Sequence, residues 1–524
     1  MDKARKHSPE PGALTVGGRP LSIADVCAVA RGASPGLNAA PAFRQRIDAG
    51  ARMLAGYIAA GRPIYGVSTG YGDSCTVSIP PQALEELPVH LIHYHGCGLG
   101  RHFDEPAAAA VLMTRLASLA AGFSGVRFEV LQQLQAFLQR RIIPLIPEEG
   151  SVGASGDLTP LSYVAAALMG ERQVYFRGRV CTAAEALGET GLQPLTFRPK
   201  EGLALMNGTS VMTALACLAW ERAEYLTRLA SRITAMASLA MDGNREHFAP
   251  GLFAAKPHAG QRQVAAWIYA DLAVGRRERN SGVQDRYSIR CAPHVIGVLA
   301  DALGWMRRDI ETELNSANDN PIIDPDSGAV YHGGHFYGGH IAFVADCLKT
   351  AVANIADLLD RQLALLVDSR FSNGLPRNLS GARGERAHLN HGFKAVQIAV
   401  SAWTAEALKL TMPASVFSRS TECHNQDKVS MGTIAARDAI RVLELTEQVA
   451  AACLAAVSQA LEIRRRLLSL PAGQPGESIR ATQQEVLTLC PFVEEDRPLE
   501  NELRSLCAAI QQRRWPLYGE EAPG

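Results

Sequence analysis

The sequence lacks an excess of either charge. Its 524 residues include 52 lysines and arginines and 52 aspartates and glutamates, so the formal net charge is zero. This balance argues against a nucleic-acid footprint and against a polybasic membrane patch. The first residues are polar, without the apolar core of a signal peptide, and no apolar run is long enough to span a bilayer. We therefore expect no nucleic-acid partner and no membrane insertion.

Paired cysteine motifs are also missing. The 11 cysteines are scattered from Cys27 to Cys507, their number is odd, and no two form a Cys-x-x-Cys pair. Scattered thiols in a long chain indicate a reducing cytoplasm rather than a disulfide framework. Two histidine clusters, at positions 90–102 and 332–340, lack the His-Glu-x-x-His or paired-cysteine spacing of a zinc site. We expect a cytoplasmic protein without a bound metal.

Aromatic residues are few (6%), whereas 47% of the chain is hydrophobic and alanine and leucine are abundant. Such a composition is typical of helix-rich proteins. Apolar residues recur at alternating spacings of three and four between Val442 and Leu467, which predicts a helix of roughly 28 residues, or about 40 Å. Similar patterns cover 211–242 and 340–367, and long helices of this kind favour a bundle. Shorter helices are predicted over 83–91 and from the capping residue Ser22 through Arg31.

The chain divides into three parts by its local signals, and no internal repeat is present. Residues 1–18 are expected to be a disordered tail, 19–205 an N-terminal domain, and 206–524 a central and C-terminal helical bundle. The fold class is therefore predicted to be all-α. Gln173 to Arg179 alternates enough to predict a small hairpin with a turn at Arg177-Gly178.

The most informative stretch is residues 153–162, GASGDLTPLS. Here Ala154, Ser155 and Gly156 follow one another directly after Gly153. With so little side-chain bulk, the backbone can fold tightly enough for an amide nitrogen to approach a nearby carbonyl carbon. Taken alone, a run of small residues before a helix is more often an ordinary loop.

Five further segments carry polar and aromatic residues among glycines: 65–72 (YGVSTGYG), 201–210 (EGLALMNGTS), 284–291 (QDRYSIRC), 313–321 (ELNSANDNP) and 332–340 (HGGHFYGGH). The first of them also matches the Gly-x-Ser-x-Gly elbow of hydrolases, which needs a strand before it and a helix after it. Pro63 precedes this segment and a loop continues after it, which argues against a hydrolase.

Together these segments, within residues 65–432, resemble the aromatic amino acid lyase family, which contains histidine, phenylalanine and tyrosine ammonia-lyases and related aminomutases. The resemblance implies that Ala154, Ser155 and Gly156 cyclise and lose water to form 4-methylidene-imidazol-5-one (MIO). This ring is an electrophile that captures the amine of a small amino acid substrate. The resemblance also implies a homotetramer in which each active site draws residues from several subunits.

The resemblance assigns roles to individual residues. Tyr65 removes the β-proton, although a tyrosine with a pKa of about 10 must be tuned by its surroundings to act as a base. Tyr287 is the second catalytic tyrosine, and Arg290 holds the substrate carboxylate, because a guanidinium can bind both oxygens. The other residues expected to contact the substrate or the ring are Tyr94, His95, Asn207, Gln284, Asn320, Phe336, Lys394, Asn425 and Gln426. His335 departs from the family, which usually has asparagine there.

The substrate is indicated by the pair Tyr94-His95. Tyrosine lyases often have His-Leu there, phenylalanine lyases Phe-Leu, and histidine lyases Ser-His. His95 can hydrogen-bond a phenol or an imidazole, and a site with such a group disfavours phenylalanine. Gln426 stands where histidine lyases carry a glutamate, and Lys394 where they usually have methionine.

Tyrosine is therefore the first expectation, with p-coumarate and ammonia as products, ahead of phenylalanine and histidine. A tyrosine 2,3-aminomutase, which returns the ammonia to the β-carbon, fits the same residues. The alternative from another class of protein is an inactive helical scaffold with an unprocessed tripeptide.

Overall fold

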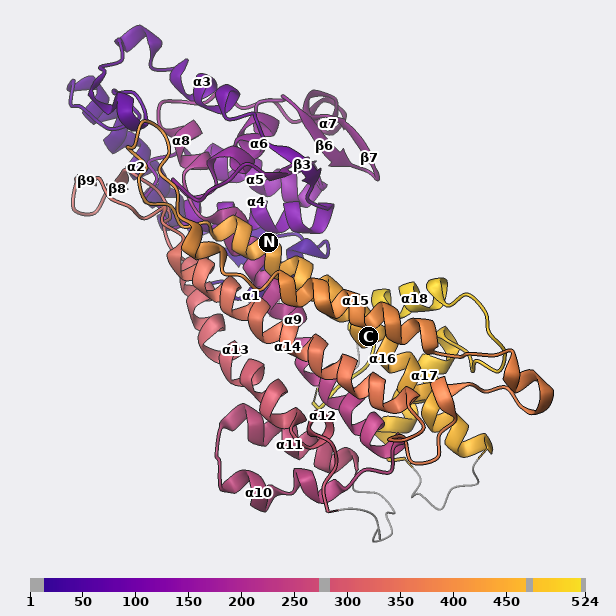
Figure 1. Cartoon of the computed structure of the whole chain (residues 1–524). Coiled ribbons are helices and arrows are strands. Elements are labelled where there is room, and N and C mark those ends of the chain that lie inside the picture. Colours follow the sequence, from indigo (N-terminus) through magenta and orange to yellow (C-terminus); the bar gives the residue numbers. More distant parts are fainter. Residues whose placement is uncertain (1–13, 273–282, 468–474, 520–524) are drawn as a thin grey trace, which may run out of the picture. The chain divides into compact units, whose positions relative to one another are not determined.

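Helices dominate the computed structural model, which describes residues 14–272, 283–467 and 475–519 (Figure 1). The chain forms two compact units. Unit 1 is drawn from residues 1–218, 307–346 and 413–437, and unit 2 from residues 219–306, 347–412 and 438–524. Four long helices have residues in both units: α9 (Ser210–Ala240), α13 (Ala292–Leu314), α14 (Gly339–Val367) and α16 (Gly432–Leu467).

Unit 1 combines short helices with small strand pairs. Its helices are α1 (Ile23–Ala30), α2 (Pro41–Ala59), α3 (Leu87–Tyr94), α4 (Glu105–Ala120), α5 (Phe128–Arg140), α6 (Leu158–Leu168), α7 (Ala183–Thr190) and α8 (Glu201–Met206). Helix α4 is buried along nearly its whole length and packs against α1 and α5. Helix α8 packs against α3 and α6.

The strands of unit 1 form small sheets of two or three strands. Strand β1 (Thr15–Val16) is parallel to β2 (Gly36–Leu37), and the other pairs are antiparallel: β3 (Leu99–His102) with β5 (Pro147–Glu149), β6 (Gln173–Phe176) with β4 (Ile143–Pro144) and β7 (Arg179–Thr182), and β8 (Ile322–Asp324) with β9 (Ala329–Tyr331). These short pairs leave the helices as the main architecture.

Unit 2 is built on the long helices. Its other helices are α10 (Pro250–Ala254), α11 (Ala259–Asp271), α12 (Tyr287–Arg290), α15 (Lys394–Lys409), α17 (Glu477–Leu489) and α18 (Glu500–Gln511). Side-chain bonds join α9, α14 and α16 within this unit: Gln362 Nε2 donates to Thr234 Oγ1 at 2.9 Å, and Arg222 pairs with Glu447 at 2.8 Å. The C-terminal Tyr518 stacks on Trp267, with 4.8 Å between ring centroids.

Short 3-10 turns complete the two units: η1 (Gly72–Thr76), η2 (Pro81–Ala83) and η6 (Ala414–Phe417) in unit 1, and η3 (Arg245–Phe248), η4 (Arg377–Leu379) and η5 (Gly384–His388) in unit 2.

The predicted all-α fold is confirmed, and so are the long helices and the hairpin at 173–182. The end of the expected tail differs: residues 1–13 lie outside the described ranges, but Thr15–Val16 are paired with β2. A helix expected to begin near Ala83 begins at Leu87 instead. Pro88 stands in its first turn, where the missing N–H of proline costs nothing.

None of the described helices combines the length and the apolar character that crossing a membrane requires. Among the described residues, no group of three or more His, Cys, Asp or Glu side chains is arranged to hold a metal ion.

Candidate active site

A cavity of about 890 Å³ lies in unit 1 and brings together most of the residues that the sequence singles out. Its lining includes Tyr65, Tyr94, His95, Ala154, Ser155, Asn207, Asn320, Phe336, Asn425 and Gln426. A cavity of this size accommodates a small organic molecule. The lining residues come from parts of the sequence that are up to about 360 positions apart, so only the fold assembles them.

The tripeptide lies at the start of α6, paired with the Asn207-Gly208 turn. Gly208 N–H donates to the Ser155 carbonyl at 3.1 Å, and Asp157 N–H donates to the Gly208 carbonyl at 2.8 Å. Gly156 has φ +68°, and a Cβ on it would collide with the Gly208 backbone. Glycine is therefore required at this close approach of two backbones.

Asp157 anchors this pairing to the starts of two long helices. One of its carboxylate oxygens accepts hydrogen bonds from the N–H groups of Val211 and Met212, at 2.9 and 3.0 Å, in the first turn of α9. The other oxygen accepts from the hydroxyls of Ser151 and Thr433. Burial raises the pKa of Asp157, and these four donors oppose the rise. A carboxylate at a helix N-terminus is favoured by the free N–H groups there.

Asn207 lines the cavity beside the tripeptide. Its Nδ2 donates to Asp319 Oδ1 at 3.1 Å and to the Asn320 carbonyl at 3.0 Å. Its Oδ1 is buried and has no hydrogen-bond partner among the described residues. A buried acceptor without a partner, next to a compact run of small residues, fits the ring implied by the resemblance and an amine donor near it.

Tyr65 also lines the cavity, and it lies in the loop that leads into η1. Its hydroxyl accepts a hydrogen bond from Gly72 N–H at 2.8 Å. Burial raises the pKa of Tyr65; the bond from Gly72 opposes this, and the negative charge of Glu422 adds to it. Tyr71 lines the same cavity, and burial raises its pKa as well.

The hydrolase elbow is not formed. Residues 65–68 form a turn, and helix α2 ends at Ala59 without a strand between it and Ser68. The Ser68 hydroxyl donates to the Arg62 carbonyl and accepts from Ile64 N–H. Ser68 is thus bonded into its own turn rather than presented on a strained strand-to-helix corner.

Glu422 is a cavity residue that the sequence did not reveal. Its two carboxylate oxygens accept from the Asp73 N–H at 3.0 and 2.9 Å, which ties the 420–428 loop to η1. The two partners are 349 residues apart in sequence, so no local spacing signals this contact. Glu422 holds the Tyr65 loop and also places a negative charge near Tyr65.

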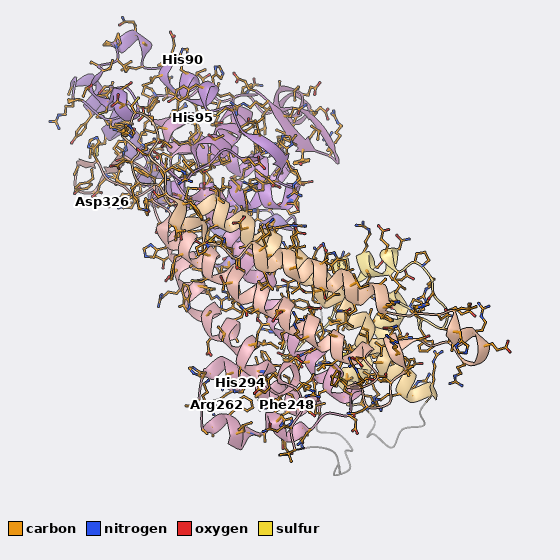
Figure 2. The ribbon with its side chains drawn as sticks, in the orientation of Figure 1. His90, His95, Phe248, Arg262, His294 and Asp326 are labelled. Atoms are coloured by element: carbon orange, nitrogen blue, oxygen red, sulfur yellow. The ribbon has the colours of Figure 1, made fainter. Side chains whose placement is uncertain are left out.

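His95, labelled in Figure 2, follows the last turn of α3. It belongs to the lining of the cavity. Its Nδ1 lies 3.0 Å from the Leu91 carbonyl oxygen, which only accepts, so Nδ1 carries the proton in the neutral ring. Nε2 is then the acceptor that remains for a ligand. Burial lowers the pKa of His95, against the bond to Leu91, and favours this neutral form. The Tyr94 ring lies beside it, with 4.5 Å between centroids.

Four of the expected residues lie in unit 2 instead. Gln284, Tyr287 and Arg290 belong to one segment that includes α12, and Lys394 begins α15. Arg290 Nε donates to the Asp285 carbonyl at 3.1 Å, and its guanidinium lies over the Tyr287 ring. Tyr287 is 71% exposed. A separate cavity of about 280 Å³ in this unit is lined by Gln284.

Comparison with known proteins identifies the family. A family model described as aromatic amino acid lyase matches residues 21–486. A histidine ammonia-lyase from Gloeobacter violaceus is 37% identical over 497 residues, covering 94% of this chain and 95% of the relative.

Solved structures agree. A tyrosine aminomutase from Streptomyces globisporus has a TM-score of 0.88 at 33% identity, covering 96% of this chain and 97% of that chain. A phenylalanine aminomutase from Pantoea agglomerans has a TM-score of 0.88 at 30% identity, covering 95% and 98%. The chain thus belongs to the aromatic amino acid lyase family and is an enzyme of the carbon–nitrogen lyase class.

Proposed function

We propose that this enzyme is an ammonia-lyase that converts L-tyrosine to p-coumarate and ammonia. The observation that carries the proposal is the state of His95, whose Nδ1 is bonded to the Leu91 carbonyl so that Nε2 is an acceptor at the cavity. A phenol hydroxyl can donate to this nitrogen. Phenylalanine has no ring donor and would leave a half-buried acceptor unpaired, which is a strong basis for discrimination.

We propose that Ala154, Ser155 and Gly156 form the MIO ring, which would supply an electrophilic carbon for the amine. Asn207 Oδ1, buried and without a partner among the described residues, would accept a hydrogen bond from that amine. Tyr65 would take the β-proton, and its loop is held for this by Gly72 and Glu422. Because burial raises the Tyr65 pKa, its base form is scarce at neutral pH and strongly basic when present.

Arg290 would hold the substrate carboxylate, with Tyr287 and Gln284 next to it. These residues are in unit 2, whereas the cavity is lined by unit 1. We propose that they complete the cavity of a neighbouring subunit in a cytoplasmic homotetramer with shared sites. The high exposure of Tyr287 supports this, because a catalytic tyrosine left open on one subunit is available to another.

A histidine ammonia-lyase is the second candidate, because the curated relatives at 37% and 38% identity bear that name. Gln426 argues against it. Its Oε1 accepts from the Thr421 hydroxyl at 3.0 Å, and an amide at this position cannot supply the negative charge that would pair with a protonated imidazole. A tyrosine aminomutase is supported by the structural similarity at a TM-score of 0.88.

The test is to incubate the purified enzyme separately with L-tyrosine, L-phenylalanine and L-histidine, and to resolve the products by chromatography with mass detection. We expect p-coumarate and ammonia from tyrosine as the dominant products. A dominant β-tyrosine product would identify an aminomutase, and urocanate from histidine would overturn the proposal. Mass spectrometry of the peptide that contains residues 154–156 should show the loss of two waters.

The role of His95 is tested by His95→Phe. We expect the ratio of kcat/KM for tyrosine over phenylalanine to fall by about 10- to 100-fold, the size of a lost polar discrimination. His93→Phe is the matched control, because His93 pairs with Glu171 at 2.9 Å and does not line the cavity. An unchanged ratio in His95→Phe would remove His95 from substrate selection.

A further inference from the structure

A fully buried ion pair contacts Asn207 through one of its two members. Lys200 Nζ is 2.6 Å from Asp319 Oδ2, and both side chains have 0% exposure. Neither residue lines the cavity, and the sequence analysis assigned a role to neither, although Asp319 lies within the segment 313–321. Two buried charges that only paired with one another would contribute little, because desolvation offsets their attraction.

The pair is connected to the cavity through the second oxygen of Asp319. Asp319 Oδ1 accepts from Asn207 Nδ2 at 3.1 Å and from Asn320 N–H at 2.7 Å. Asn207 Nδ2 also donates to the Asn320 carbonyl. A carboxylate and a carbonyl oxygen only accept, so both must face the amide NH2. The opposite rotamer would set Asn207 Oδ1 against two acceptors, and the amide therefore has one allowed orientation.

The backbone of Asn207 is held as firmly as its amide. Its N–H donates to the Leu203 carbonyl at 2.7 Å, and its carbonyl accepts from Nη1 of the buried Arg115 at 3.0 Å. The only polar atom of Asn207 left without a partner among the described residues is Oδ1.

Lys200 itself has an unusual backbone. Its φ is +80°, in the left-handed region that residues with a side chain seldom occupy. The conformation stands immediately before α8, at whose start Glu201 pairs with Arg127 at 2.7 Å. Strain of this kind persists only where the surroundings determine it and is concentrated at functional sites.

We propose that Lys200 and Asp319 are positioning residues that hold the Asn207 amide with Oδ1 as the free acceptor beside the Ala154–Gly156 tripeptide. Lys200 binds Asp319 Oδ2 at 2.6 Å, and Asp319 Oδ1 accepts from both Asn207 Nδ2 and Asn320 N–H, so one carboxylate links the lysine to the Asn207 amide. The inference deepens the proposed function and rests on the same site.

The test is a double-mutant cycle between Lys200→Met and Asn207→Ala. Lys200→Met keeps an unbranched side chain, one atom shorter than lysine, and removes its charge. We expect kcat to fall by about 100-fold in each single variant, the size typical of losing one oriented polar group in an active site. If Lys200 acts through Asn207, the double variant will be no slower than Asn207→Ala alone. Multiplicative losses, or a Lys200→Met variant within twofold of the wild type, would overturn the proposal.

A second readout does not depend on turnover. The peptide that contains residues 154–156 is weighed in each variant, and the fraction that has lost two waters is measured. We expect this fraction to fall in Lys200→Met and Asn207→Ala alike. A wild type that loses the waters but does not act on tyrosine would contradict the proposed substrate while leaving this comparison intact. Complete processing in Lys200→Met, together with unchanged kcat, would contradict the positioning role.

Two controls separate positioning from folding. The double variant Lys200→Met with Asp319→Asn leaves no unpaired charge at this position, and the amide oxygen of residue 319 can still accept from Asn207. We expect its kcat to be at least about 10-fold higher than that of Lys200→Met alone. Lys349→Met removes another fully buried lysine, paired with Asp438 at 3.1 Å in unit 2. We expect it to process the tripeptide normally. An equal loss of processing in Lys349→Met would show that burial of a lysine, rather than its contact with Asn207, explains the effect.

Discussion

Two buried lysines each pair with an aspartate, but the surroundings of the two pairs differ. Lys200 pairs with Asp319 in unit 1, and Lys349 pairs with Asp438 in unit 2; both lysine side chains have 0% exposure. Asp319 is also fully buried and passes its remaining hydrogen bonds to Asn207 and Asn320 at the cavity. Asp438 is 29% exposed, and Lys349 donates in addition to the Met412 carbonyl. Lys200 is linked to the cavity through its partner Asp319, whereas Lys349 itself bonds a backbone carbonyl away from the cavity.

The same contrast separates other buried polar groups of the two units. Asp157 in unit 1 joins the tripeptide segment to the starts of α9 and α16. Arg464 in unit 2 donates to the carbonyls of Ser372 and Asn373, at 3.0 and 2.8 Å. The first arrangement fixes the tripeptide segment to two helix starts, and the second satisfies backbone carbonyl groups that would be costly to leave unpaired.

The largest effect is expected from Ser155→Ala. The bond from Gly208 N–H to the carbonyl of residue 155 remains, so the fold should be retained while ring formation is lost. We expect turnover to fall by at least about 1000-fold, as for the loss of a central catalytic group. Turnover and the mass of the 154–156 peptide are measured together. Near-normal turnover would refute the assignment of the tripeptide.

The proposed division of catalytic residues between the units is tested by complementation. Tyr65→Phe and Arg290→Ala should each be severely impaired, since one lies at the unit 1 cavity and the other in unit 2. If a site takes them from different subunits, a mixed refolded sample will regain about a quarter of wild-type activity, because one site in four pairs two intact residues. No recovery in mixtures that form mixed oligomers would contradict shared sites.

The difference between the two lysines can be tested by measuring the stability of Lys349→Met. Removing one partner of a buried ion pair leaves the other uncompensated, and the exposure of Asp438 places the cost at the lower end of such effects. We expect the free energy of unfolding to fall by about 3 kcal/mol. Denaturant unfolding measures this, and kcat of the folded enzyme should stay within twofold. A loss of kcat in Lys349→Met without a loss of stability would contradict the proposed difference between Lys200 and Lys349.

A smaller effect is expected from Glu422→Gln. Burial and then the charge of Glu422 raise the pKa of Tyr65, so the base form of Tyr65 appears only as pH rises. Glutamine removes the negative charge and keeps an acceptor for Asp73 N–H. The Tyr65 pKa should fall, and the rising limb of kcat/KM against pH should move to lower pH by up to about one unit. A shift to higher pH would contradict the assigned sign.

The smallest effect is expected at an exposed ion pair of unit 2. Arg386 Nε lies 2.6 Å from Glu495, and both side chains are at least half exposed. Solvent screening makes such pairs nearly neutral for stability. Arg386→Ala should leave the melting temperature and the pH profile unchanged. A clear drop in melting temperature would show that this pair belongs to a larger network.

Much of the helical fold could be predicted because its signals are local. The three-and-four spacing predicted α16, and Ser22 predicted the start of α1, where a capping box is present. The pairing of Gln173–Phe176 with Arg179–Thr182 followed from alternation and a turn. The start of α3 was misplaced, since helical patterns define helix ends poorly when 3-10 turns precede them.

For the site, motifs in the sequence identified the residues but not their arrangement. The roles of Tyr65, Asn207 and Arg290 rest on resemblance and remain predictions, although the first two line one cavity. Glu422 and Asp319 were missed because each acts on a partner far away in the sequence, 349 residues for Asp73 and 112 residues for Asn207. Such contacts leave no periodicity and no spacing to detect.

By itself, the sequence determined the helical character of this chain, the helix caps and the run of small residues at 153–156, because these depend on neighbours within a few positions. Only the tertiary structure decided that Asp157 joins the starts of two helices and that His95 shares a cavity with Tyr65 and Asn207. The tertiary structure also decided that a buried lysine is linked to Asn207 through Asp319. The physical reason is that orientation and protonation depend on which groups surround a side chain, and those groups come from all parts of the chain.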